Sequence, residues 1–125
     1  MIADSTFLID LVRERRSGHR GPALSFLAAQ RASVVRACVI GIGEVAVAFP
    51  TSAEAWHYFR AFRIYPLHRG IVDAAADVDR ELIQSGERLG ENDNWIAGFG
   101  RFYREPLISR DAAFDRVRGL RRLAY

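Results

Sequence analysis

The first nine residues, Met1–Ile9, read MIADSTFLI, and this stretch decides which kind of fold to expect. Met1–Ala3 is short and apolar, as expected of a buried strand, and it leads directly into Asp4. The residues that follow predict a helix, because aspartate, serine and threonine favour helix starts and apolar side chains then recur at helical spacing. The stretch therefore predicts a strand that runs into a helix, with a carboxylate at the junction.

The rest of the chain alternates in the same way between short apolar stretches and helical patterns. Further strands are predicted at 33–39, 63–67, 106–108 and 120–124, and further helices at 22–30, 41–49, 51–62, 70–85, 92–104 and, for one turn, 111–114. The polar, glycine-containing segment 13–21 is predicted to be a loop, and Asn92 or Asp93 is expected to cap its helix. Strands alternating with helices favour a parallel sheet between helical layers. We expect one α/β domain over 1–125, a three-layer α/β/α sandwich around a mostly parallel sheet.

Composition is that of an ordinary globular domain, with half of its 125 residues apolar and 26% charged. No apolar run approaches the roughly 20 residues that cross a bilayer, so no membrane segment is expected. Met1–Asp4 lacks the basic-then-apolar order of a secretory signal. The single cysteine, Cys38, has no partner for a disulfide or a zinc site. These features together favour a cytoplasmic protein.

All eighteen basic residues are arginine, and the formal net charge is +3. Arginine binds phosphate in bidentate fashion, but a genome biased toward arginine codons is the preferred explanation of the composition. A cluster in the predicted first loop comprises Arg13, Arg15, Arg16 and Arg20. These arginines could hold RNA phosphates near Asp4 or form a solvated loop, and both interpretations stay open.

Four acids lie where the predicted elements meet: Asp4, Glu44, Asp93 and Asp111. Asp4 ends the first predicted strand, Asp111 lies just past the strand at 106–108, Glu44 lies about one helical turn after a strand, and Asp93 begins a helix. In parallel sheets, ligands bind beyond the carboxyl ends of the strands, so all four can gather at one edge. Four carboxylates repel one another unless a divalent cation or an arginine lies between them. Mg²⁺ and Mn²⁺ prefer such oxygen ligands and can activate water against a phosphodiester.

Each acid also has a structural interpretation. Asp4 and Asp93 are suitable helix caps, and Asp111 is a common type of turn residue. Glu44 is harder to explain structurally, because it lies in an otherwise apolar stretch and charged residues are rarely buried without a partner. The case for a site therefore depends on the four acids together.

Four segments, in order along the chain, resemble the motifs of PIN-domain ribonucleases: IADSTFLI at 2–9, GEVA at 43–46, LGENDNWIAG at 89–98 and PLISRDAAF at 106–114. The third is the most specific, since it is similar to the family's Asn-Asp-x-x-Ile-Ala-Ala motif. The resemblance spans nearly the whole chain. It implies a Rossmann-like α/β/α fold and cleavage of RNA that depends on Mg²⁺ or Mn²⁺.

The resemblance also implies roles for particular residues. Asp4 and Asp93 would be the principal metal ligands, Glu44 a ligand directly or through water, and Asp111 the fourth acid of the catalytic pocket. Thr6 and Ser109 match hydroxyl positions that orient these acids.

Two departures from the family pattern affect the fourth acid. Ala113 stands where an acid often precedes the closing phenylalanine, and Ser109 replaces a commoner threonine. Asp115 is therefore an alternative fourth acid, and Glu91 could contribute from its loop.

Among PIN-domain proteins, compact chains of this length resemble VapC toxins. This resemblance implies a homodimer, an RNA substrate and neutralisation by a VapB-like antitoxin, whose tail can place a basic side chain among the acids. A possible groove for that tail comprises Phe7, Leu8, Leu11, Phe26 and Leu27, for which core packing is the competing interpretation. Two other functions stay open: a catalytically inactive binding module, and another Mg²⁺-dependent phosphoesterase. A haloacid-dehalogenase-like enzyme is disfavoured, because Thr6 stands where that class has a second aspartate.

Overall fold

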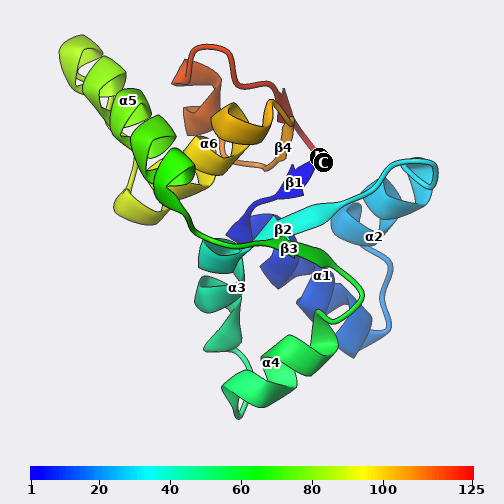
Figure 1. The fold of residues 1–125 in the computed structure, drawn as a ribbon. Helices are drawn as coiled ribbons and strands as arrows, with labels where there is room; N and C mark the ends of the chain where they lie inside the picture. The colour runs from blue at the N-terminus through cyan, green and yellow to red at the C-terminus, as the bar shows by residue number, and fades with distance from the viewer.

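The computed structural model describes all residues, 1–125. In chain order the elements are β1 (Ile2–Ala3), α1 (Ser5–Ser17), α2 (Pro22–Ala29), β2 (Arg36–Cys38), α3 (Val39–Ala46), α4 (Ser52–Tyr58), β3 (Arg63–Tyr65), α5 (Arg69–Ser85), α6 (Glu91–Tyr103), β4 (Leu107–Ile108), the 3₁₀ helix η1 (Ala112–Arg116) and β5 (Arg122–Leu123). Figure 1 shows their arrangement. The predicted alternation of strands and helices is confirmed.

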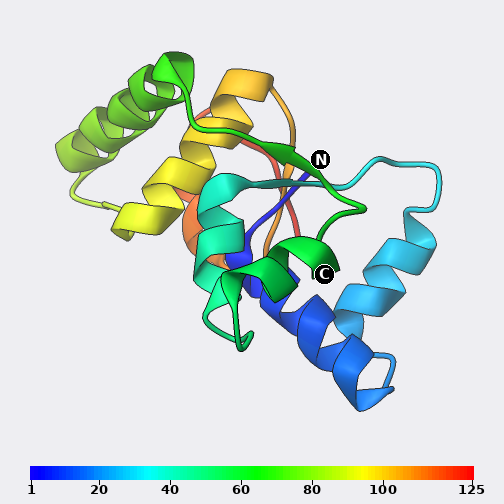
Figure 2. The same cartoon turned by 60° about the horizontal axis from the view of Figure 1, so that its bottom comes forward.

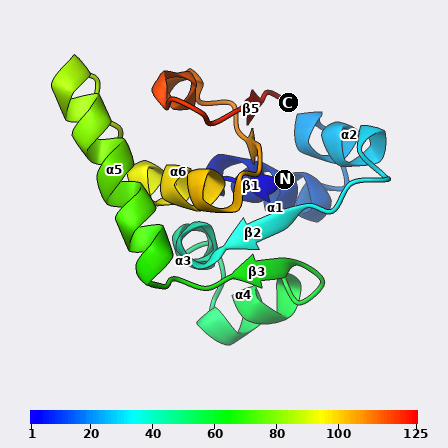
Figure 3. The same ribbon diagram turned by 45° about the horizontal axis from the view of Figure 1, so that its top comes forward.

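The five strands form one sheet in the order β3-β2-β1-β4-β5, and every pairing is parallel. β1 is the central strand, while β3 and β5 lie at the two edges (Figure 3). Because all strands run the same way, their carboxyl ends lie along one side of the sheet, which we call its carboxyl edge. The segments that follow β1, β2 and β4 start there.

Alternation along the strands divides the core into two halves, one on each face of the sheet. Ile2 and Leu107 pack in the half that includes α5 and α6, whereas their neighbours Ala3 and Ile108 pack in the half that includes α1 to α4. Successive strand side chains point to opposite faces, so each short strand contributes to both halves. The result is the predicted three-layer α/β/α sandwich. No helix is both long and apolar enough to cross a bilayer.

The predicted loop at 13–21 is wrong for its first half, because α1 continues to Ser17. Arginine and glutamate are good helix formers, and the helix ends only where Gly18 adopts a left-handed conformation with φ 71°. The short connection then folds α2 back alongside α1 (Figure 2). This extension places part of the arginine cluster on a rigid helix.

Core packing is the correct interpretation for three residues of the proposed antitoxin groove. Phe7, Leu8 and Leu11 are fully buried, whereas Phe26 and Leu27 are half-buried at the edge of the same half of the core. The first three therefore cannot line an open groove.

Candidate functional site

Asp4 is buried at the carboxyl end of the central strand. Its Oδ1 accepts a hydrogen bond from the backbone N–H of Phe7 at 2.7 Å, which makes Asp4 the N-cap of α1. Its Oδ2 accepts from the Thr6 hydroxyl at 2.7 Å and from the Ser109 hydroxyl. The side chain is only 1% exposed. Asp4 is thus a helix cap, and the same contacts fix its carboxylate at the sheet edge.

Ser109 joins the ends of two neighbouring strands. It is fully buried after β4, donates to Asp4 and accepts the backbone N–H of Asp111 at 3.0 Å. Asp111 itself is exposed and caps η1 by accepting from the N–H of Ala113 at 2.8 Å. Thr6 and Ser109 therefore hold Asp4 between them, as the resemblance implies for these hydroxyl positions.

Glu44 reaches the start of α6 from α3. Its Oε1 accepts from the Asn92 side-chain amide at 2.9 Å, while its Oε2 is buried with no hydrogen-bond partner. A buried carboxylate oxygen without a partner is costly. The atom is therefore suited to an additional ligand.

Asp93 is half-buried in the first turn of α6 and is not its cap. The N-cap is Gly90, with no side-chain hydrogen bond, so the expected capping by Asn92 or Asp93 is wrong. Burial raises the pKa of Asp93, and the negative charges of Asp111, Glu44 and Asp4 raise it further. Asp93 therefore lies close enough to each of the other three acids to interact with it electrostatically.

Burial also raises the pKa of Asp4, although its hydrogen bonds from Ser109, Phe7 and Thr6 oppose that effect. The charge of Asp111 adds to the increase. None of the four acids makes an ion pair, since no basic group lies within 4.0 Å of any of their carboxylates. In a chain with eighteen arginines, the four carboxylates have no ion-pair partner, and the charge of Arg122 acts on Asp111 only at longer range.

The donor atoms fit a hard divalent cation, which prefers carboxylate oxygens and keeps several waters. Glu44 contributes an unpartnered oxygen, and the Asp93 carboxylate makes no hydrogen bond to protein. The four carboxylates do not converge on one point. No group of three or more His, Cys, Asp or Glu side chains is arranged to hold an ion. The chemistry of the donors fits a cation, and binding would require the side chains to approach one another.

Asp111, rather than Asp115, interacts electrostatically with Asp4 and Asp93. Asp115 forms a bidentate ion pair with Arg122, at 2.9 and 2.7 Å, and these contacts lower its pKa. Glu91 is exposed and lines a separate pocket between α5 and α6. Neither alternative is therefore placed like Asp111.

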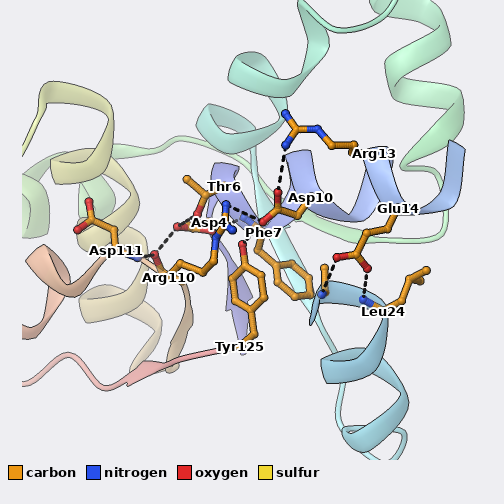
Figure 4. A network of polar contacts seen from close by, with 12 residues as sticks. Asp4, Thr6, Phe7, Asp10, Arg13, Glu14, Leu24, Arg110, Asp111 and Tyr125 are labelled. Atoms are coloured by element: carbon orange, nitrogen blue, oxygen red, sulfur yellow. Dashed lines mark hydrogen bonds and ion pairs between the residues drawn. The ribbon is translucent and has the colours of Figure 1, made fainter. Parts of the chain in front are cut away.

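A fifth acid, Asp10, was not among the site residues predicted from the sequence. It is 9% exposed on α1, accepts from the Tyr125 hydroxyl at 2.8 Å and pairs with Arg110 at 2.9 Å (Figure 4). Asp10 lies between the apolar residues Ile9 and Leu11, and a charged residue within an apolar stretch is the same sequence pattern that made Glu44 a candidate. Its partners, however, come from the other end of the chain.

No family model and no curated protein matches this sequence, but solved structures match its fold. A chain of VapBC2 from Rickettsia felis, solved with a promoter DNA fragment, aligns with a TM-score of 0.76 and 15% identity, over 99% of this chain and 97% of that one. A chain of VapBC-1 from nontypeable Haemophilus influenzae gives 0.76 and 18%, over 98% and 96%. A chain of a Klebsiella pneumoniae toxin–antitoxin complex gives 0.69 and 22%, over 95% and 93%. The PIN-domain fold predicted from the sequence is therefore confirmed.

Proposed function

We propose that this chain is a metal-dependent endoribonuclease, the toxin of a type II toxin–antitoxin pair. The observation that carries the proposal is the group of four carboxylates at the carboxyl edge of the sheet, none of which forms an ion pair. Burial and neighbouring negative charge raise the pKa of two of them, Asp4 and Asp93. A group of neighbouring carboxylates without an ion pair is expensive to maintain for stability alone. It suits a protein whose substrate chemistry requires a divalent cation.

Asp4, Glu44, Asp93 and Asp111 would hold Mg²⁺ or Mn²⁺. When bound, the cation would activate the attacking water and stabilise negative charge on the RNA phosphate. Thr6 and Ser109 orient the Asp4 carboxylate, and Asn92 orients Glu44. These contacts reduce the reorganisation that the acids undergo on binding the cation.

The partners proposed for this chain are an RNA substrate, a VapB-like antitoxin and a second copy of itself. The solved chains of the same fold come from complexes named as VapBC or toxin–antitoxin assemblies. An antitoxin arginine inserted among the four acids would supply the positive charge that the chain lacks there, through charge-assisted hydrogen bonds. Inhibition and cation binding would then compete for the same carboxylates.

The decisive experiment is RNA cleavage by the purified chain, freed of antitoxin. We expect cleavage with Mg²⁺ or Mn²⁺ and none with a chelator. Asp93→Asn should lower the rate by at least about 100-fold, the order found when a preorganised electrostatic group is removed from a reacting centre. Asp115→Asn is the matched control, because Asp115 is paired with Arg122, and it should cleave at the wild-type rate. Full activity of Asp93→Asn would refute the assignment.

Two measurements separate the alternative functions. Calorimetry with Mn²⁺ distinguishes an enzyme from an inactive binding module, because a module that has lost its site would bind no metal. Hydrolysis of a small phosphate monoester without cleavage of RNA would instead indicate another phosphoesterase. Absence of Mn²⁺ binding, or hydrolysis of the monoester without cleavage of RNA, would contradict the proposal.

A further inference from the structure

A polar pocket of about 250 Å³ lies between the end of α1, the start of α2 and the segment after β4. Its charged and titratable lining residues are Asp10, Arg13, Glu14, His19, Arg20 and Arg110. Apart from Pro22, no residue of this lining has an apolar side chain. The pocket is therefore suited to a charged ligand and offers no anchor for an apolar one.

The two carboxylates of this pocket are already bonded within the protein. Glu14 accepts three backbone N–H groups at the start of α2, from Gly21, Ala23 and Leu24, at 2.8 to 3.1 Å. Asp10 is held by Tyr125 and Arg110. Their hydrogen-bonding capacity is thus largely used inside the fold.

The three arginines of the pocket, in contrast, keep most of their donors free. Arg20 is exposed and makes no hydrogen bond or ion pair with the protein. The Arg13 side chain is 75% exposed, and its single ionic contact is a long 3.8 Å to Asp10. The Arg110 side chain is 55% exposed and bonds Asp10 through one nitrogen. Open guanidinium groups facing one small pocket can bind a phosphate in bidentate fashion.

The other two arginines of the sequence cluster turn elsewhere. Arg16 donates to the carbonyl of Ala48 and lies over the Phe49 ring, while Arg15 lies over Tyr58. The structure therefore divides the cluster, and only Arg13 and Arg20 join Arg110 at the pocket.

Arg110 connects this pocket to the acidic site. It stands in the chain between Ser109, which bonds Asp4, and Asp111. Figure 4 shows it between Asp111 on one side and Asp10 and Arg13 on the other. We infer that Arg13, Arg20 and Arg110 bind a backbone phosphate of the RNA strand, next to the phosphate that is cleaved. This assignment rests on the proposed function. RNA is favoured over a peptide, because the lining has charge but no apolar anchor.

The test is binding of a short fluorescein-labelled oligouridylate, measured by anisotropy in EDTA over a series of KCl concentrations. Under these conditions binding is observed without cleavage. Each phosphate contact to single-stranded RNA contributes a slope of about 0.7 in log K against log salt. Arg13→Ala with Arg20→Ala removes the contact to this one phosphate, so it should reduce the slope by about 0.7 and weaken binding roughly tenfold at low salt.

Matched variants separate a defined site from general charge. Arg69→Ala with Arg80→Ala removes the same charge from exposed positions on α5 and should change affinity much less. Arg13→Lys with Arg20→Lys should keep the slope but bind more weakly, because lysine cannot form the bidentate contact. An equal loss in the α5 control, or no loss in Arg13→Ala with Arg20→Ala, would overturn the inference.

The remaining outcomes distinguish this inference from the proposed function. A chain that cleaves RNA while Arg13→Ala with Arg20→Ala binds normally keeps the function and loses the phosphate site. A chain that binds through these arginines but never cleaves keeps the phosphate site and loses the function. Failure of the wild-type chain to bind the oligouridylate, with oligoglutamate bound through the same arginines, would assign the pocket to a protein partner and refute the RNA site.

Discussion

Substitution of Gly98 by alanine tests how closely the helix that carries Asp93 must pack. Gly98 is buried in the interior of α6. A Cβ added there would lie 2.7 Å from the Cβ of Ala75 on α5 and 3.0 Å from its Cα and N. These atoms belong to the backbone or to a side chain without rotamers, so only a shift of one helix against the other relieves the overlap.

The size of the effect follows from two opposing contributions. Overpacking a core costs about 1–3 kcal/mol, and alanine recovers about 1 kcal/mol over glycine in a helix interior. Since no side chain can rotate away, we expect the upper part of the first range and a net loss of about 1–2 kcal/mol. The control is Gly43→Ala on α3, where an added Cβ meets no atom within 4 Å and should stabilise by about 0.5–1 kcal/mol.

Urea unfolding followed by far-UV circular dichroism measures both variants. The expected result is a lower midpoint for Gly98→Ala and a higher midpoint for Gly43→Ala, with unchanged m-values. If Gly98→Ala is as stable as the wild-type chain, the close approach of α5 and α6 is not the constraint inferred here.

Two further predictions concern stability. Glu14→Ala should lower the free energy of unfolding by about 1–3 kcal/mol, because the backbone N–H groups at the start of α2 that donate hydrogen bonds to Glu14 lose their acceptor. Glu87→Ala, at an exposed site, is the control in the same urea titration. Burial would raise the pKa of Glu105, but hydrogen bonds from the N-terminal ammonium and Tyr65, with the nearby charges, lower it below 4.5. Its contribution to stability should be complete above pH 4.5 and lost as the pH falls through the lower folded-state pKa. If the free energy of unfolding falls with decreasing pH in Glu105→Gln just as it does in the wild-type chain, the prediction is contradicted.

The fold could be predicted from the sequence because local patterns and global topology agree. A short apolar stretch ending in Asp4, followed by helical periodicity, implies a strand that enters a helix, and repetition of that unit implies a parallel sheet. The boundaries were less predictable. The extension of α1 to Ser17 depends on where Gly18 turns left-handed, and the polar residues before it fit a loop or an exposed helix equally well.

The candidate site was predictable as a set of residues, because strand ends in a parallel sheet converge whatever the details of packing. The choice between Asp111 and Asp115 was not predictable, since it depends on Arg122 pairing with Asp115. Nor could the sequence separate the arginines that line the pocket from those that stack on Phe49 and Tyr58.

The order of the elements and the parallel sheet follow from short-range patterns along the chain, so the sequence alone was enough to predict them and to nominate four acids as a candidate site. Which side chains hydrogen-bond to one another depended on the tertiary structure. Ser109 binds Asp4 across 105 positions, and Tyr125 binds Asp10 across 115. Contacts at such separations leave no periodic signal in the sequence, because they form only when the folded sheet brings the two ends of the chain together.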